Sequence, residues 1–263
     1  MPTSSRPSLD IDALRTATSG TEWRRVDVVG ETGSTNADLI ARATAGEDIA
    51  GAVLLADFQS AGRGRHGRTW SAPPRSQISM SVGVDTTGVP AAQWGWLPLL
   101  TGLAVAGTVR EQFGVGAGVK WPNDVLVGTG KLAGILAEVS APVIVVGLGL
   151  NVSLSPDELP DPNAVSLSML GIDADRTALA GHLLRALSER LGRWRDGDPG
   201  LAEEYRSVST TIGTRVRALL PGDSEIVGVA TDIDEAGRLL IDDAGTTVTV
   251  SAGDITHLRP AEA

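Results

Sequence analysis

The sequence contains no cysteine and only three histidines. Without cysteine the chain forms no disulfide, holds no metal through thiolate and has no cysteine nucleophile. The histidines, His66, His182 and His257, lie far apart in the sequence, so we expect no zinc centre and assign no metal-ligating residue. Thiol chemistry is therefore excluded, and a protein-bound metal is not predicted.

The chain also lacks a basic balance and a long apolar run. It has 32 acidic against 22 basic residues, a net charge of −10. Binding to a nucleic-acid backbone needs a broad basic face, so we expect no DNA partner. The longest apolar run, Val143 to Leu150, is too short to cross a bilayer, and residues 1–10 show no apolar signal-peptide core. We expect a cytoplasmic protein without a membrane partner.

The 263 residues contain 42% hydrophobic and 21% charged residues, which is ordinary globular composition. Hydrophobic patterns predict helices over 11–17, from 34 onward, over 94–111 and over 176–195. Strands are predicted over 25–29, 52–56, 78–84, 125–127, 131–139 and 143–148. The connections among the last three strands are too short for crossovers and permit only antiparallel pairing between neighbours. We therefore predict an α+β fold with a largely antiparallel sheet flanked by helices.

The last fifty residues differ in character, because short strand patterns alternate there with turns. The strands are predicted over 215–219, 226–229, 239–241 and 246–250. The turns are Asp234 to Gly237, Asp242 to Gly245 and Pro221-Gly222. We predict a small β-barrel over 213–263, following a larger domain over 1–212.

An unusual stretch runs from Gln59 to Trp70 and packs three glycines and three arginines around His66. Its glycines match the dinucleotide fingerprint G-x-G-x-x-G, but Pro73 and Pro74 prevent the helix that this fingerprint requires. Two interpretations remain. The stretch is either a solvated surface loop, or a loop that folds over an anionic, phosphate-bearing ligand through close backbone approach and guanidinium groups. Trp70 favours the second, because an exposed indole is costly unless it acquires a stacking partner.

Four further segments each have an ordinary and a functional interpretation. Lys120-Trp121-Pro122-Asn123-Asp124 is either a polar turn or a site, and Trp121 is a poor choice for a solvated corner. Lys131 is not part of a P-loop, because Leu132 replaces Ser/Thr, and a strand-edge lysine is usually solvated. Asn151, after Gly147 and Gly149, either ends a strand or has a side chain that hydrogen-bonds the base or ribose of a nucleotide. The stretch 34–36 is a helix start, with Thr35 and Asp38 resembling a capping box.

Taken together, these segments resemble the biotin protein ligase family over residues 25–155, and the C-terminal region resembles it more loosely. The segments that carry the resemblance are Ser34-Thr35-Asn36, Gln59, Gly62 to Arg68 with Trp70, Lys120 to Asp124, Lys131 to Leu136 and Gly147 to Asn151. The Arg-rich loop together with Lys-Trp-Pro-Asn-Asp is highly specific. The resemblance implies a class II synthetase-like catalytic core and a small SH3-like C-terminal barrel.

The resemblance also implies a reaction in two steps. The biotin carboxylate attacks the α-phosphate of ATP and gives biotinoyl-5′-AMP and pyrophosphate. The ε-amine of a carrier lysine then attacks this mixed anhydride and releases AMP. ATP and biotin are thus substrates, and Mg²⁺ is implied with ATP although its ligands are not identified. The implied partner is the biotin carboxyl carrier domain of acetyl-CoA carboxylase or of a similar biotin-dependent carboxylase.

The family's site residues carry over to matching positions of this sequence. The residues implied to bind biotin are Ser34, Thr35, Asn36, Gln59, Arg63, Gly64, Arg65 and Lys131. Those implied to bind ATP or the adenylate are Arg68, Trp70, Lys120, Asn123 and Asn151. The catalytic residues implied are Lys131, Arg63, Lys120 and Asp124, the last to orient or deprotonate the incoming lysine.

Two other functions compete with this one. A lipoate–protein ligase shares the fold and the adenylate chemistry, but its characteristic Gly-Gly-Gly and His-containing segment is not found. A non-catalytic module that binds a nucleotide or nucleic acid could use the same arginines. Larger members of the family carry an N-terminal winged helix that binds DNA. Only about two dozen residues precede the first predicted strand here, so we do not expect a repressor.

Overall fold

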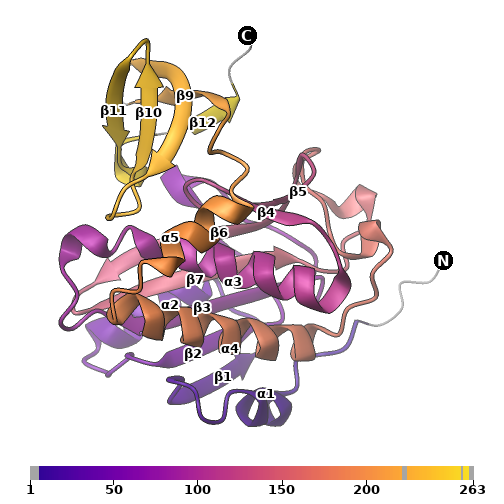
Figure 1. Cartoon of the computed structure of the whole chain (residues 1–263). Helices are drawn as coiled ribbons and strands as arrows, with labels where there is room; N and C mark the ends of the chain where they lie inside the picture. Colours follow the sequence, from indigo (N-terminus) through magenta and orange to yellow (C-terminus); the bar gives the residue numbers. More distant parts are fainter. Residues whose placement is uncertain (1–5, 221–223, 256, 261–263) are drawn as a thin grey trace.

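The computed structural model describes residues 6–220, 224–255 and 257–260, and its strands form two sheets (Figure 1). The larger sheet has seven strands in the order β1-β2-β3-β7-β6-β5-β4. Their bounds are Arg25–Val29 (β1), Ala52–Ala56 (β2), Gln77–Asp85 (β3), Ala117–Lys120 (β4), Asp124–Val127 (β5), Gly130–Ser140 (β6) and Val143–Asn151 (β7). Only β1 and β2 pair in parallel, and the other neighbours in this sheet are antiparallel. The predicted α+β fold with a mixed, largely antiparallel sheet is confirmed.

The helices of the described chain cover both faces of this sheet. They are Ile11–Ala17 (α1), Thr35–Thr44 (α2), Trp96–Phe113 (α3), Arg176–Arg195 (α4) and Gly200–Val208 (α5). Strand β2 is buried on both faces, since Leu54 packs in one cluster with Leu39 of α2 while Val53 and Leu55 belong to the main core. None of these helices combines the length and the apolar character needed to cross a bilayer.

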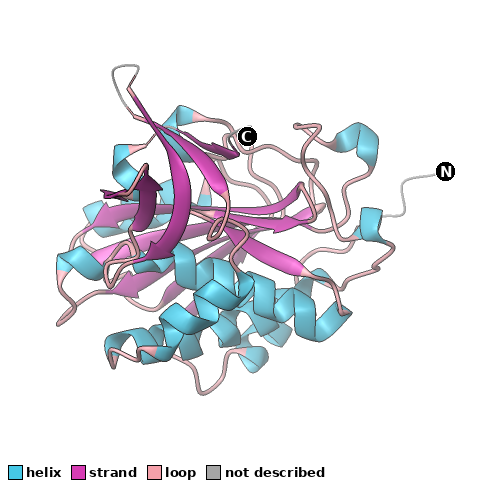
Figure 2. Ribbon diagram, turned by 45° about the horizontal axis from the view of Figure 1, so that its top comes forward, coloured by secondary structure: helices cyan, strands magenta, loops and turns pink. Residues whose placement is uncertain are grey.

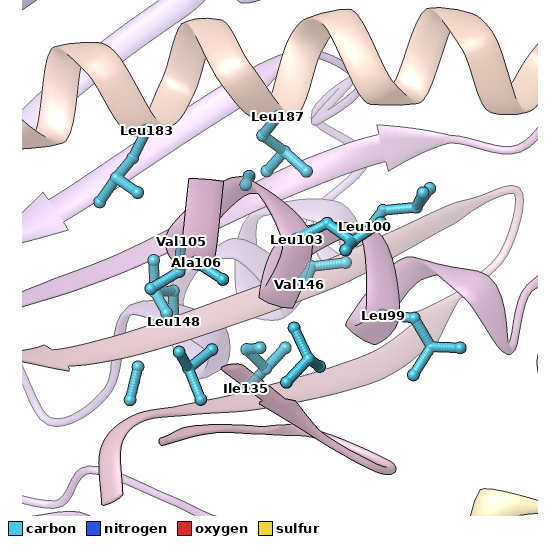
Figure 3. Close-up of a cluster of buried hydrophobic side chains, with 14 of the residues drawn as sticks. Leu99, Leu100, Leu103, Val105, Ala106, Ile135, Val146, Leu148, Leu183 and Leu187 are labelled. Atoms are coloured by element: carbon cyan, nitrogen blue, oxygen red, sulfur yellow. The ribbon is translucent and has the colours of Figure 1, made fainter. Parts of the chain in front are cut away.

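The main core is a stack of three layers. Figure 3 shows Leu183 and Leu187 of α4 above Leu100 and Leu103 of α3, with Ile135, Val146 and Leu148 of the sheet below. Helix α3 is buried along most of its length, because it lies between α4 and the sheet and presents apolar side chains in both directions. This packing leaves the opposite face of β6 and β7 free to line a site, because successive residues of a strand point to opposite faces.

The second sheet is antiparallel and has five strands in the order β11-β10-β9-β8-β12. Its strands are Arg215–Leu219 (β8), Glu225–Ile233 (β9), Leu239–Asp243 (β10), Thr246–Val250 (β11) and His257–Pro260 (β12). Figure 2 shows these curved strands beside the larger sheet. Two indole N–H groups hold the turn between β9 and β10 against the larger domain: Trp96 Nε1 of α3 donates to the Glu235 carbonyl at 2.8 Å, and Trp121 Nε1, between β4 and β5, donates to the Gly237 carbonyl at 3.0 Å. Trp121 is thus a buried structural residue rather than part of a solvated corner.

The sequence predicts the long elements better than the short ones. The four predicted helices and the predicted strands are present, several with the predicted bounds and the others with shifted ends, whereas α5, β4 and β12 were not predicted. The capping box of Thr35 and Asp38 is wrong. Ser34 is the N-cap of α2, and the Asp38 carboxylate instead accepts from the Thr32 hydroxyl at 2.6 Å. The predicted turn Pro221-Gly222 lies outside the described residues, and the domain boundary near 212 stays a prediction.

A buried ion pair joins the two ends of the Gly/Arg stretch. Asp57, just after β2, and Arg176, at the start of α4, are 6% and 5% exposed and lie 2.6 Å apart. The same guanidinium donates to the Gln77 carbonyl at 2.9 Å, and Arg75 lies 3.4 Å from the other Asp57 oxygen. The chain therefore leaves β2 and enters β3 at a single fixed point, and the residues between them form the loop.

We expect Asp57→Asn to lower the free energy of unfolding by about 3 kcal/mol, because a buried guanidinium loses its counter-charge. Urea denaturation followed by circular dichroism measures the change. The control is Asp232→Asn, which weakens the half-exposed pair with Arg206 and should cost less than about 1 kcal/mol. Equal losses in the two variants would contradict the anchoring role of Asp57.

Candidate functional site

A cavity of about 400 Å³ opens over the β5–β7 part of the larger sheet. Five parts of the chain line it: the start of α2, the Gln59–Ser71 loop, Met80 of β3, the stretch from Asn123 through β5 to β7, and the segment 160–164. The volume suits a small organic ligand. The sequence-predicted residues that line it are Ser34, Thr35, Asn36, Gln59, Arg63, Gly64, Arg65, Arg68, Trp70, Asn123, Asp124, Lys131 and Asn151. Lys120 is the one predicted site residue that is not among them.

One end of the cavity is polar and buried, and it is built from the first turn of α2. Gln59 Oε1 accepts from the Thr35 backbone N–H at 2.8 Å and lies 3.0 Å from the Thr35 hydroxyl. The same hydroxyl lies 2.6 Å from Ser81 Oγ of β3, beneath the cavity. Helix α2 therefore enters the site with its polar N-terminal residues fixed by side chains of the loop and the sheet.

Asn36 is held by all of its amide atoms. Its Oδ1 accepts from Ser81 Oγ at 2.5 Å, and its Nδ2 donates to the Leu136 carbonyl at 3.2 Å and to Glu138 Oε2 at 2.8 Å. A Cβ at Gly147 would lie 2.3 Å from Asn36 Oδ1, so glycine is required there. Asn36 contributes a fixed wall to the site, and its orientation depends on residues that the sequence did not indicate.

The Gly/Arg stretch forms a small hairpin over the cavity. Gly64 N–H donates to the Arg68 carbonyl at 2.7 Å and Trp70 N–H donates to the Gly62 carbonyl at 2.9 Å. Arg63 extends to Glu138 of β6, with 3.1 Å between Nη2 and Oε2. One face of the loop is thus bound to the same carboxylate that holds Asn36.

The tip of the hairpin reaches the C-terminal sheet. Arg65 donates to Asn123 Oδ1 at 3.2 Å, to the Ile255 carbonyl at 3.1 Å and to the Ala252 carbonyl. Burial lowers the pKa of the Arg65 guanidinium and nearby Arg68 acts in the same direction, whereas the Asp124 carboxylate raises it. The side chain of Arg65 therefore bridges the loop, the 120–124 segment and the C-terminal region.

Trp70 lies flat on a part of the sheet that has no side chains. A Cβ at Gly149 would lie 2.3 Å from its indole Nε1, and a Cβ at the paired Gly134 would lie 3.0 Å from its ring. The indole N–H donates to Gln77 Oε1 at 2.6 Å. The predicted exposed indole is therefore half-buried, and its partner in this structure is the glycine surface.

Lys131 stands between the two ends of the cavity. Its Nζ is 2.6 Å from Asp124 Oδ1 and 5.5 Å from the centre of the Trp70 ring. The ammonium is therefore paired and stacked rather than simply solvated.

Asn151, at the end of β7, is buried and donates to the Val165 carbonyl at 3.1 Å. Lys120 and Lys131 are the only lysines in the sequence; the other 20 basic residues are arginines.

The segment 160–164 was missed in the sequence. Pro160, Asp161, Pro162 and Ala164 line the cavity beside Lys131, whose N–H donates to the Asn163 carbonyl at 2.7 Å. Its proline and aspartate residues indicate a turn, and only the pairing with β6 places it at the site.

No cluster of three or more His, Cys, Asp or Glu side chains that could hold a metal occurs in the described part of the chain.

The arrangement has a definite chemical character. Acceptor oxygens lie at the buried end, a lysine lies at the centre, and arginines lie over the mouth beside an aromatic ring. Such a cavity can bind a ligand with N–H groups at one end and a carboxylate beside a phosphate at the centre. It places cations where a carboxylate and a phosphate could lie side by side.

Two family matches cover most of the chain. Residues 34–153 match the Biotin/lipoate A/B protein ligase family, and residues 211–258 match the Biotin protein ligase C terminal domain. The sequence is 55% identical to the biotin–[acetyl-CoA-carboxylase] ligase of Mycobacterium tuberculosis, over 97% of both chains.

Solved structures agree with these matches. The fold is similar to a biotin protein ligase from Aquifex aeolicus in complex with biotin and ATP, with a TM-score of 0.79, 27% identity and coverage of 90% of this chain and 100% of that one. It is also similar to a biotin protein ligase from Leishmania major in complex with biotinyl-5-AMP, with a TM-score of 0.62, 26% identity and coverage of 87% and 99%.

We expect Gly149→Ala to displace Trp70 from the sheet and to cost about 1–3 kcal/mol of stability, because the added methyl group overlaps the indole. Subtracting the fluorescence spectrum of the same variant with Trp70→Phe isolates the Trp70 emission, which should shift to longer wavelength. The control is Gly116→Ala, where no atom lies within 4 Å of the added Cβ. An unchanged Trp70 spectrum in Gly149→Ala would show that the indole does not lie on this surface.

Proposed function

The chain belongs to the biotin protein ligase family, and on that premise we propose how its cavity divides between biotin and ATP. It is an ATP-dependent enzyme that activates biotin as biotinoyl-5′-AMP and transfers the biotinoyl group to a lysine of a carrier protein. The observation that carries the proposed division is the position of Lys131, between the buried acceptor end of the cavity and the Trp70 ring.

Biotin occupies the end formed by α2 and the loop. Its ureido ring lies against Thr35, Gln59 and the backbone of Gly64, with Ser34 and Asn36 completing the wall. Its carboxylate points to Lys131, with Arg63 and Arg65 along the chain. The support for this direction is chemical, because the buried end offers neutral acceptor oxygens whereas the centre and the mouth carry the cations.

ATP occupies the remaining part of the cavity. The adenine stacks on Trp70 and the ribose lies near Asn151 and the 160–164 segment, which leaves the phosphates to Lys131, Arg68 and Asn123. Lys120 is adjacent to Trp121 in the sequence and does not line the cavity. Its part in ATP binding therefore rests on the family resemblance alone.

The first step needs two anions to meet. A biotin carboxylate oxygen attacks the α-phosphorus, the bond to the β,γ-phosphates breaks and pyrophosphate leaves. Lys131 lowers the repulsion between the two reactants and stabilises the charge that develops on the α-phosphate. Asp124, at 2.6 Å from Nζ, fixes the ammonium in that position.

The second step needs the intermediate to be kept from water until the carrier arrives. The loop serves this purpose because it lies over the cavity between Glu138 and the C-terminal sheet. The carrier ε-amine attacks the carbonyl carbon of the mixed anhydride, AMP leaves and the amine loses a proton. Asp124 is the carboxylate beside the reacting centre that can orient this amine or accept its proton.

ATP enters as its Mg²⁺ complex, and the lining residues fit this in a limited way. Mg²⁺ bound to phosphates needs only one or two carboxylates and keeps several waters. Asp124 and Asp161 are the carboxylates that line the cavity, and Asp124 is already paired with Lys131. Asp161 is therefore the residue that would contact the ion.

The carrier is the biotin carboxyl carrier domain of acetyl-CoA carboxylase or of a similar biotin-dependent carboxylase. The Mycobacterium tuberculosis relative is named for acetyl-CoA carboxylase, which supports this choice. The rival is a lipoate–protein ligase: the first matching family is named for both biotin and lipoate, whereas the second is named for biotin protein ligases alone. The C-terminal match therefore favours biotin.

We expect pyrophosphate release from ATP that depends on biotin, followed by incorporation of labelled biotin into a purified carrier domain. Lipoate in place of biotin should give less than about 1% of the rate, because a site built for ureido N–H groups rejects a ligand that lacks them. Binding of ATP without biotin-dependent turnover would make the protein a non-catalytic module. Equal rates with lipoate would establish the rival function.

We expect Lys131→Ala to lower the kcat of adenylation at least 100-fold, which is the usual effect of removing one preorganised donor. The urea midpoint should change little, because the Lys131–Asp124 pair is 30% and 23% exposed. The matched control is Arg195→Ala, which breaks an equally exposed pair with Glu22 remote from the cavity and should leave turnover unchanged. Unchanged turnover in Lys131→Ala would remove the central assignment.

A further inference from the structure

A chain of hydrogen-bonding side chains runs beneath the biotin end of the cavity. Gln59 Oε1 accepts from the Thr35 backbone N–H, and side-chain hydrogen bonds continue from the Thr35 hydroxyl through Ser81 and Asn36 to Glu138. Ser81 lies on β3, is fully buried and does not line the cavity. Glu138 lies on β6 and also pairs with Arg63. Neither Ser81 nor Glu138 touches the ligand space, and both are connected to residues that do.

The direction of this chain follows from counting its protons. A carboxylate can only accept a hydrogen bond. The Asn36 amide atom 2.8 Å from Glu138 Oε2 must therefore be the NH₂ group, Nδ2. The Leu136 carbonyl, at 3.2 Å, requires the same side. Asn36 Oδ1 therefore faces Ser81, and the single Ser81 proton is used in the 2.5 Å bond to it.

The Thr35 hydroxyl then has one proton and two neighbouring oxygens. Ser81 Oγ is 2.6 Å away and has no proton left to give, whereas Gln59 Oε1 is 3.0 Å away and already accepts from the Thr35 N–H. The Thr35 hydroxyl therefore donates to Ser81 Oγ, the nearer of the two oxygens. The donors thus all point toward Glu138, and the oxygens at the cavity end, Thr35 Oγ1 and Gln59 Oε1, have lone pairs available.

We propose that Ser81 and Glu138 are positioning residues that set this direction, so that Thr35 and Gln59 present acceptors to the two ureido N–H groups of biotin. The inference rests on the proposed function and deepens it, since it assigns the specificity for an N–H donor to residues outside the cavity. A site whose hydroxyl protons pointed the other way would present a donor to a donor and would repel the ureido ring.

The chain also has a mechanical consequence. Gln59 opens the loop, and Arg63 lies within it, so both ends of the chain attach to the same loop through Thr35 and Glu138. Filling the ureido position completes the acceptor end, and the opposite end holds Arg63 over the bound ligand. Recognition of the ring and placement of the loop are therefore parts of one network.

The experiment measures the biotin KM and kcat of adenylation in Ser81→Ala. Loss of this hydroxyl releases the Thr35 proton toward Gln59 Oε1 and should raise the biotin KM about tenfold with kcat within about twofold, because the ureido ring is remote from the reacting carboxylate. A purely structural defect would instead lower the active fraction and reduce kcat at unchanged KM. Glu138→Ala should raise KM less, since the Leu136 carbonyl still holds Asn36.

A substrate analogue sharpens the test. In a cyclic carbamate analogue of biotin, one ring N–H is replaced by oxygen. The wild type should use biotin much better than the analogue. In Ser81→Ala, the kcat/KM for biotin divided by the kcat/KM for the analogue should fall at least fivefold, because the freed Thr35 hydroxyl can donate to the ring oxygen of the analogue. The effects of Ser81→Ala and Glu138→Ala on KM should be less than additive in the double variant, since both loosen Asn36, while Glu138→Ala also removes the partner of Arg63.

The controls come from the same elements. Ser79→Ala changes a buried serine of the same strand whose hydroxyl has no hydrogen-bond partner within the described structure, and it should leave KM and the analogue ratio unchanged. Glu22→Ala removes a carboxylate of matching exposure that pairs with Arg195. An unchanged KM in Ser81→Ala, or an equal shift in Ser79→Ala, overturns the inference while leaving the ligase function intact. A wild type that does not bind biotin in calorimetry overturns both.

Discussion

The cavity exists because neighbouring positions on β6 and β7 carry no side chain. Gly134 and Gly149 are paired across the strands, and Gly147 lies two residues before Gly149 on β7. Any Cβ at Gly147 or Gly149 would lie 2.3 Å from Asn36 or Trp70. The bare backbone lets helix α2 approach from one side and the Trp70 indole from the other, and these two elements bound the space in which the substrates are proposed to lie.

The loop over this surface is held at points far apart in the sequence. The Asp57–Arg176 pair fixes both of its ends, Glu138 holds Arg63, and the Ala252 and Ile255 carbonyls accept from Arg65. The C-terminal sheet is in turn placed by the indoles of Trp96 and Trp121. The short C-terminal region therefore belongs to the structure of the site, because part of the loop is positioned against it.

Much of this could be predicted from the sequence, and the remainder depends on contacts between distant strands. Short turns after residue 125 required antiparallel pairing, and the loop, Lys131 and the glycines were recognisable as a family pattern that the comparisons confirm. Ser81 was only a polar position in an alternating strand until β3 placed it beneath Asn36. The 160–164 segment had only the composition of a turn. The sequence indicated that Trp121 was a poor choice for a solvated corner, but not that its indole is buried and donates to the Gly237 carbonyl.

The scarcity of lysine has a chemical consequence for a protein that makes an acylating agent. A mixed anhydride that escapes from the cavity reacts with unprotonated amines, and a guanidinium stays protonated at physiological pH and is a poor nucleophile. The 20 arginines give this chain its surface cations without offering amines, and its two lysines both lie in the 120–131 region. The chain therefore offers few ε-amines to its own reactive intermediate, since 20 of its 22 basic side chains are arginines.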